Sequence, residues 1–180
     1  MWKTSVAVAN LSGFDNYFAL FDLTPAFKIQ REALEAAYLA VQKEVHPDKH
    51  ASASDAQKRA SMQMATVVNT AYRTLKQPIS RGLYLCDLHG IDPQLETNTA
   101  MPTEFLMQQM AWREALEEAG SDTTQLEILY KEVNEARTRL LHQVEETIDV
   151  ANNYTEAAKH LRALLFVEKF TEELEEAMAA

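Results

Sequence analysis

Glycine and proline are scarce in this chain, with four Gly and five Pro among 180 residues. Because these residues form most tight turns, their scarcity argues against the many short strands of an all-β protein. Ala, Leu, Glu and Gln are abundant instead, and they lose little side-chain freedom in a helix. We therefore expect an all-α protein, in which 47% hydrophobic residues suffice for a packed core.

Cysteine and long apolar runs are also lacking. Cys86 is the single cysteine, which excludes an intramolecular disulfide framework and any CxxC pair for structural zinc or redox chemistry. No run reaches the roughly 18 apolar residues of a membrane span, and residues 1–13 are too short and too mixed for a secretory signal. These features predict a soluble, cytoplasmic protein from a reducing compartment.

Positively charged residues are also scarce, with 17 Lys and Arg against 27 Asp and Glu. The net charge is −10, but residues 1–90 carry ten Lys and Arg against eight Asp and Glu, whereas residues 91–180 carry seven against nineteen. Neither half has the basic groove with interleaved aromatic residues that nucleic-acid binding requires. We expect no nucleic-acid partner, and we expect the two halves to face different protein partners.

The first half of the chain predicts capped helices. A short helix over Asn16–Phe21, capped by Asp15, is followed by a helix over Ile29–Val45 with apolar residues at three- and four-residue intervals. A long helix then begins after a cap at Ser54 or Asp55. Its predicted apolar face comprises Met62, Ala65, Val68, Tyr72 and Leu75.

His46, Pro47 and Asp48 follow the predicted helix over Ile29–Val45. Pro47 disfavours α geometry in the residue before it, so the helix must stop at His46, and a loop with Asp48 follows. The two long helices would then form an antiparallel hairpin with His46, Pro47 and Asp48 at its tip. Such a loop could be a metal site, an acid–base pair or a recognition surface.

The chemistry of this loop favours recognition. His46 and His50 have the four-residue spacing of zinc ligands on a helix, but Pro47 breaks the helix between them. A catalytic dyad of His46 and Asp48 would need a concave, water-excluding pocket, and a hairpin tip is convex and wet. A solvated turn without a role would leave the position of the motif between the two helices unexplained.

The second half predicts a three-helix bundle. A short helix from Pro78 ends at Gly90, and the stretch Ile91–Pro102 has two prolines and little periodicity, as is typical of a linker. Three helices follow, over about Thr103–Ala119, Thr124–Ile148 and Tyr154–Met178. Their short connections imply antiparallel neighbours. The predicted apolar stripe of the middle helix is Leu126, Leu129, Tyr130, Val133, Leu140, Leu141, Val144 and Ile148.

The outer helices of this bundle each carry two apolar stripes, although we expect a helix packed on its neighbours to need only one. In the first, Phe105, Trp112, Leu116 and Ala119 face one side, whereas Leu106, Met107 and Met110 face the other and run into Glu114, Glu117 and Glu118. In the last, Leu161, Leu164 and Leu165 face one way and Phe166, Val167 and Phe170 roughly the other. We therefore expect one surplus stripe in each helix, either for a partner or buried against the first half of the chain.

Several segments together resemble the J domain of DnaJ-type co-chaperones: NYFALFDL, KEVHPDK and NTAYRTL. This resemblance implies that His46, Pro47 and Asp48 bind a DnaK-type chaperone and stimulate its ATPase. Lys43 and Lys49 flank the motif and would add electrostatic steering. Gln42 and Glu44 make the preceding helix less basic than in many J domains, which favours a dedicated chaperone partner over a general one.

Segments of the second half resemble the HscB family of iron–sulfur co-chaperones: RGLYLCDLHG, FLMQQMAWREALEEA and ALLFVEKFTEELEE. The resemblance extends from Asn16 to Glu176 and implies an L-shaped arrangement of a J domain (14–90), a linker (91–102) and a bundle (103–180). It implies an HscA-type chaperone and an IscU-type scaffold as partners. The implied scaffold-binding residues are Leu106, Met107, Met110, Glu114, Glu118 and Phe166.

The resemblance further implies the bacterial form of the family, and we expect a cytoplasmic adaptor without enzymatic activity. No Gly-rich phosphate loop is present, and no cofactor or metal is expected. Trp112 is expected to anchor the bundle core, and Cys86 to be a buried small hydrophobe. Two alternatives stay open: a J-domain protein with a different client, and an enzyme or metal protein built on His46, Asp48 and His50.

Overall fold

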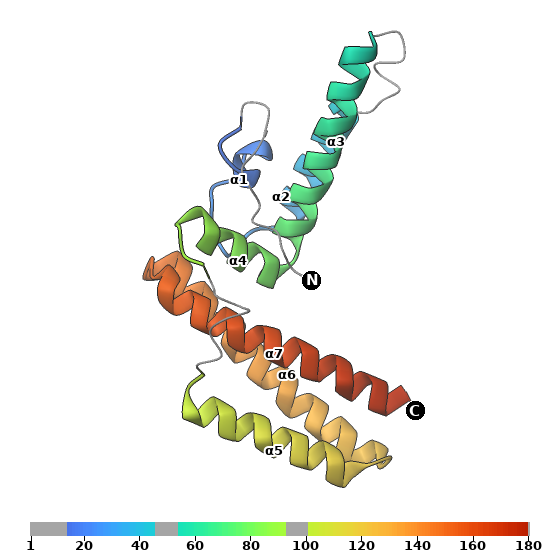
Figure 1. The fold of residues 1–180 in the computed structure, drawn as a ribbon, viewed down its shortest axis with the longest axis vertical. Coiled ribbons are helices and arrows are strands. Elements are labelled where there is room, and N and C mark those ends of the chain that lie inside the picture. Colours follow the sequence, from blue (N-terminus) through green and yellow to red (C-terminus); the bar gives the residue numbers. More distant parts are fainter. Residues whose placement is uncertain (1–13, 46–53, 93–100, 180) are drawn as a thin grey trace. The chain divides into compact units, whose positions relative to one another are not determined.

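The computed structural model describes residues 14–45, 54–92 and 101–179, and all regular structure in these ranges is helical (Figure 1). This confirms the expected all-α class. The chain divides into two compact units, residues 1–81 and 82–180. None of the helices in the described ranges is long and apolar enough to cross a membrane.

The first unit contains α1 (Tyr17–Leu20), α2 (Arg31–Val45) and α3 (Asp55–Lys76). The predicted cap of α1 was wrong, because the side chain of Asn16, not Asp15, accepts the hydrogen bond from the Ala19 N–H at 2.9 Å. The cap of α3 is Ser54, the first of the two predicted residues. The backbone N–H of Gln57 binds its side chain, and the Gln57 side chain in turn binds the Ser54 backbone.

Helices α2 and α3 pack against each other as an antiparallel pair. At one end the Ser61 hydroxyl donates to the Val45 carbonyl at 2.8 Å, and further along the Tyr38 hydroxyl donates to Asn69 Oδ1 at 3.0 Å. The rings of Tyr38 and Tyr72 stack with centroids 4.0 Å apart. Residues late in α2 therefore meet residues early in α3, which confirms the predicted hairpin.

The predicted apolar face of α3 needs one correction. Met62 is 61% exposed, and Ser61 is buried beside the end of α2 instead. The reason is the free carbonyl of Val45, because the last carbonyls of a helix lack a partner within that helix. The hydroxyl of Ser61 supplies the missing hydrogen bond. Further along α3, Val68 and Leu75 are fully buried as expected.

The boundary of the two units, between Arg81 and Gly82, falls within the first turns of helix α4 (Pro78–Leu88). Near its start the buried guanidinium of Arg81 donates to the carbonyls of Phe27 and Leu75, both at 2.6 Å. Gly90 follows the helix with φ +70°, a backbone conformation that glycine adopts without steric cost. The predicted start and end of this helix are confirmed.

The second unit contains a bundle of α5 (Thr103–Ala119), α6 (Thr123–Glu145) and α7 (Tyr154–Ala179). The predicted α6 ran to Ile148, but the structure forms a π-helical turn, η2 (Glu146–Val150), directly after Glu145. The Ala151 N–H binds the Glu146 carbonyl at 2.9 Å, the five-residue spacing of a π-helix. Ile148 stays buried within this turn.

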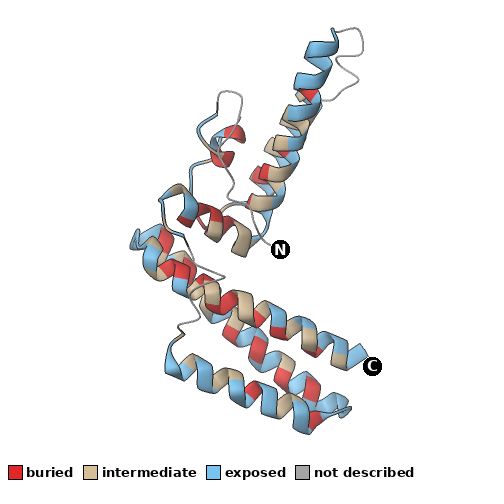
Figure 2. Ribbon diagram, viewed as in Figure 1, coloured by how far each residue is buried: buried red, intermediate tan, exposed pale blue. Residues whose placement is uncertain are grey.

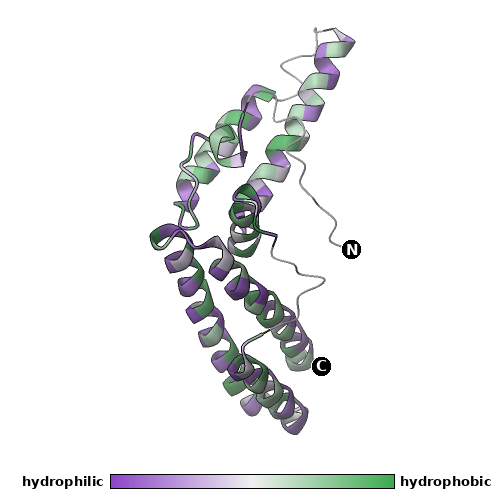
Figure 3. Ribbon diagram, turned by 60° about the vertical axis from the view of Figure 1, so that its left-hand side comes forward, coloured by the Kyte–Doolittle hydropathy of each residue, from purple (hydrophilic) through white to green (hydrophobic). Residues whose placement is uncertain are grey.

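Buried residues recur along α6 and α7, whereas most of α5 is exposed, and the hydropathy of the ribbon alternates along each bundle helix (Figures 2 and 3). One cluster joins all three helices: Trp112, Ala119, Leu126, Leu129, Val133, Ala136, Val167, Phe170 and Leu174. Five of the eight residues in the stripe predicted for the middle helix are buried: Leu126, Leu129, Val133, Val144 and Ile148. The other three, Tyr130, Leu140 and Leu141, are half-buried.

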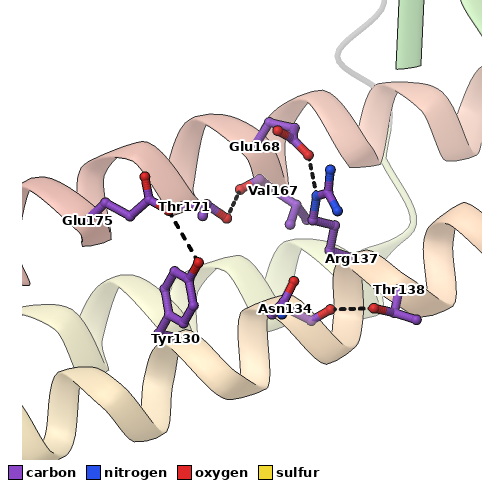
Figure 4. Close-up of polar contacts among 8 residues, drawn as sticks. All are labelled: Tyr130, Asn134, Arg137, Thr138, Val167, Glu168, Thr171 and Glu175. Atoms are coloured by element: carbon purple, nitrogen blue, oxygen red, sulfur yellow. Dashed lines mark hydrogen bonds and ion pairs between the residues drawn. The ribbon is translucent and has the colours of Figure 1, made fainter. Parts of the chain in front are cut away.

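The expectation of a surplus stripe in α7 was wrong. Leu161 and Leu164 are buried, and so are Val167 and Phe170 on the side that we expected to be free. The reason is that α7 packs on two helices rather than one. It contacts α6 through the Arg137–Glu168 ion pair and a hydrogen bond from the Tyr130 hydroxyl to Glu175 (Figure 4). It contacts α5 through the stacked rings of Trp112 and Phe170.

Candidate functional site

The chaperone-binding residues predicted from the sequence lie largely outside the described residues. His46, Pro47, Asp48 and Lys49 belong to the range 46–53, between the end of α2 at Val45 and the cap of α3. Their role stays a prediction. Lys43 is described, and its side chain is exposed in the last turn of α2.

The surplus stripe predicted for α5 is exposed. Leu106, Met107 and Met110 have exposed fractions of 42%, 66% and 71%. Glu114 and Glu118 continue along the same side of the helix and are also exposed. We call these five residues the α5 outer face. Its composition, flexible apolar side chains next to carboxylates, is typical of a surface that adapts to a protein partner.

The opposite side of α5 fixes the orientation of this face. Trp112 is 1% exposed, and its indole N–H donates to Glu132 Oε1 on α6 at 2.9 Å. Gln108 donates to the same oxygen at 2.9 Å. The predicted role of Trp112 as a core anchor is confirmed. Because these contacts hold α5 in one rotational setting, the two methionines must point away from the bundle.

Phe166 lies at the edge where α7 meets α5, beside the α5 outer face. Its ring is half-buried and meets Phe105 edge-on, with centroids 6.0 Å apart, and Phe170 in a stacked arrangement at 6.5 Å. Phe166 is thus not part of a free stripe on α7. It is the partly exposed end of a row of aromatic rings that continues through Phe170 to Trp112.

Arg113 also belongs to this region, although the apolar pattern of the sequence did not point to it. Its guanidinium carbon lies 5.7 Å from the centre of the Phe166 ring, and its Nη1 lies 3.6 Å from Glu173 Oε2 on α7. One signal could have drawn attention to it, since Arg113 is the single basic residue in α5. It comes three residues after Met110 and seven after Leu106, spacings that place it beside them on a helix.

The described residues contain no group of three or more His, Cys, Asp and Glu side chains that could hold a metal ion. Cys86 is buried, as expected for a small hydrophobe, and its thiol donates to the Tyr154 carbonyl at 3.6 Å. His89 stacks on the Tyr154 ring, with centroids 3.6 Å apart. Its Nδ1 lies 2.8 Å from the Leu85 carbonyl, so this imidazole has a structural role.

The buried thiol predicts a pH dependence of stability. Burial raises the pKa of Cys86 from the ordinary value of 9.0 to about 11. Between these values the unfolded chain loses a proton that the folded chain keeps, so the free energy of unfolding should fall as the pH rises from about 9 to about 11.

Urea unfolding of the native chain and of Cys86→Ala, at about pH 8 and about pH 10.5, measures this contribution. The native chain should lose more stability between the two pH values than the variant does. Groups that do not interact with Cys86 affect both chains and cancel in the difference, whereas Tyr154, whose pKa is raised by burial and in part by the charge of Cys86, contributes as part of the effect of the thiol. An equal loss in both chains would contradict the prediction.

Comparison with known proteins agrees with this architecture. Residues 101–175 match the family model described as the HSCB C-terminal oligomerisation domain. The co-chaperone protein HscB homolog of Azoarcus sp. is 43% identical over 167 residues, which cover 92% of this chain and 94% of the relative. The homolog of Bordetella avium is 44% identical over 160 residues, covering 89% and 95%.

Solved structures give the same answer. Chaperone HscB from Vibrio cholerae superimposes with a TM-score of 0.77 at 32% identity, covering 89% of this chain and 96% of the other. Human co-chaperone HscB superimposes with a TM-score of 0.82 at 31% identity, covering 89% and 81%. The matches cover about nine tenths of this chain, and identities of 31–44% are higher than a shared fold alone requires. The chain belongs to the HscB family of co-chaperones, which act in iron–sulfur cluster assembly.

Proposed function

We propose that this co-chaperone brings two proteins together. The α5 outer face, with Phe166 at its edge, binds an IscU-type scaffold that carries the nascent iron–sulfur cluster. His46, Pro47 and Asp48, with Lys43 and Lys49 beside them, bind an HscA-type chaperone of the DnaK family and stimulate its ATPase. The domain limits proposed for these roles are residues 14–90 and 103–180, with a linker at 91–102.

The observation that carries the scaffold assignment is the exposure of Leu106, Met107 and Met110 on a helix whose opposite side is anchored in the bundle by the buried Trp112. Exposed apolar side chains gain free energy when a partner removes them from water. Methionine is flexible and polarizable, so the pair can adjust to the shape of the partner. The partner should therefore present an apolar patch.

The charge of this region further restricts which partner surfaces can bind. Glu114, Glu117 and Glu118 are exposed beside the apolar residues, and residues 91–180 carry an excess of negative charge. Carboxylates at the rim of an interface select a partner with Lys or Arg at matching positions and accelerate its association. We expect the affinity to fall as salt is added, because these charges are exposed.

The chaperone assignment is supported by the hairpin beside the motif. Pro47 fixes one backbone angle between His46 and Asp48, and so presets their side chains for a charged, hydrogen-bonding partner surface. Lys43, one turn before His46, is exposed and can steer the encounter. We propose that ATP hydrolysis takes place in the partner and that this chain has no catalytic activity and no cofactor of its own. We propose that both proteins act in the bacterial cytoplasm.

Calorimetric titration of an IscU-type scaffold into this chain tests the scaffold assignment. We expect saturable binding to the native chain. The variant with Leu106→Ala, Met107→Ala and Phe166→Ala should bind roughly thirtyfold more weakly or worse, because a few buried apolar anchors supply most of the binding free energy of an interface.

The matched control is Ile128→Ala, which removes an exposed apolar side chain from α6 (58% exposed), away from the α5 outer face. It should bind like the native chain. Equal affinities of the native chain and the triple variant would move the scaffold site elsewhere. No binding by the folded native chain would leave a co-chaperone with a different client, which a pull-down with a generic unfolded protein would then detect.

A further inference from the structure

Arg113 connects two helices at the edge of the α5 outer face. Its guanidinium lies over the Phe166 ring at 5.7 Å from the ring centre, and Glu173, two helical turns further along α7, pairs with it at 3.6 Å. The side chain of Arg113 is 55% exposed and that of Glu173 35% exposed. Both contacts therefore lie at the surface, where they stabilise the bundle little.

The aromatic row restrains the Phe166 ring from within the bundle. Phe105 meets its edge, and Phe170, itself stacked on Trp112, lies alongside it. These contacts leave part of the ring open, as its half-buried state shows. Arg113 covers the ring from the α5 side, and so the ring is held by both helices before any partner arrives.

A ring that is already held in place loses less freedom when a partner binds it, so the complex is more stable. Arginine suits this task because its planar guanidinium stacks on aromatic faces while its N–H groups bind a carboxylate. Lysine carries a compact ammonium charge but lacks the planar group that stacks on a ring. The pairing with Glu173 orients the guanidinium in turn.

We propose that Arg113 is a positioning residue of the scaffold site: its side chain holds the Phe166 ring in the orientation that the scaffold recognises. This inference rests on the scaffold-binding function proposed above. The charge of the surface argues for an indirect role. The neighbouring carboxylates of Glu114 and Glu117 select a cationic partner surface. A direct contact of Arg113 with that surface would be repulsive.

A double-mutant cycle tests this role. The scaffold is titrated into the native chain, Arg113→Gln, Phe166→Ala and the double variant, with circular dichroism and thermal unfolding to establish that each is folded. We expect Arg113→Gln to weaken binding about three- to tenfold in the native background and less than about twofold in the Phe166→Ala background. Arg113→Lys should recover part of the loss.

The matched control is Arg139→Gln, which removes the same charge from an exposed site on α6. Because it makes the protein more acidic, it should leave binding to a cationic partner unchanged or slightly tighter. A loss from Arg113→Gln that exceeds this control, and that depends on Phe166, supports the positioning role.

Three outcomes would overturn it. Native affinity in Arg113→Gln, with Phe166→Ala still weakened, refutes the role of Arg113 and leaves the scaffold site intact. The same loss in both backgrounds shows that Arg113 acts on the scaffold without Phe166. Absence of binding by the folded native chain refutes the proposed function itself, and the inference with it.

Discussion

His46→Gln is expected to abolish stimulation of the partner ATPase and to leave the affinity for the scaffold unchanged. Glutamine keeps a polar side chain of similar length but loses the imidazole ring and its ability to carry a positive charge. The backbone restriction at Pro47 stays, so the loop should keep its course. The proposed scaffold residues are all in residues 101–179, within the second compact unit, and do not include the substituted position.

Two measurements separate these effects. The steady-state ATP turnover of an HscA-type chaperone is followed with the native chain and with the variant, and the scaffold is titrated into both by calorimetry. His142→Gln is the matched control, because it replaces an exposed histidine on α6 that is paired with Glu146 at 3.7 Å. Full stimulation by His46→Gln would refute the assignment of the loop.

Trp112→Ala is expected to lower the free energy of unfolding by about 3–5 kcal/mol, the range for removing a large aromatic side chain from a core. Trp112 is almost fully buried and stacks on Phe170, and its indole N–H donates to Glu132. The cluster that it joins connects all three bundle helices. Few single substitutions should weaken the bundle more, and scaffold binding should weaken with it.

Urea unfolding of the full chain, followed by circular dichroism at helical wavelengths, measures this loss. Trp112→Phe is the matched control, since it keeps a ring against Phe170 and removes only the indole hydrogen bond and part of the volume. It should cost about 1–2 kcal/mol. A value for Trp112→Ala within about 1 kcal/mol of the native chain would show that α5 is not anchored through this residue.

Much of the architecture could be predicted because its signals are local. The end of α2 was predicted from Pro47, whose ring restricts the residue before it, and the beginning of α3 from Ser54 and its capping chemistry. Helical periodicity separated the two sides of α5, because Trp112 marks the side opposite the methionines, and the family resemblance implied that the methionine side binds a partner. In each case the deciding residues lie within the helix that they shape or within a few positions of its end.

The tertiary structure decided what depends on contacts between distant residues. Periodicity showed that α7 has two apolar stripes but not that both are buried, because that depends on α7 packing against α5 and α6 together. Ser61 replaces Met62 in the α3 core because a carbonyl of α2 needs a donor there. Arg113 and Phe166 are far apart in sequence, and only the packing of α5 on α7 places the guanidinium over the ring. The sequence by itself therefore determined the helices, most of their ends and the composition of each face, whereas packing determined which faces are covered, since burial depends on the neighbour as well as on the residue.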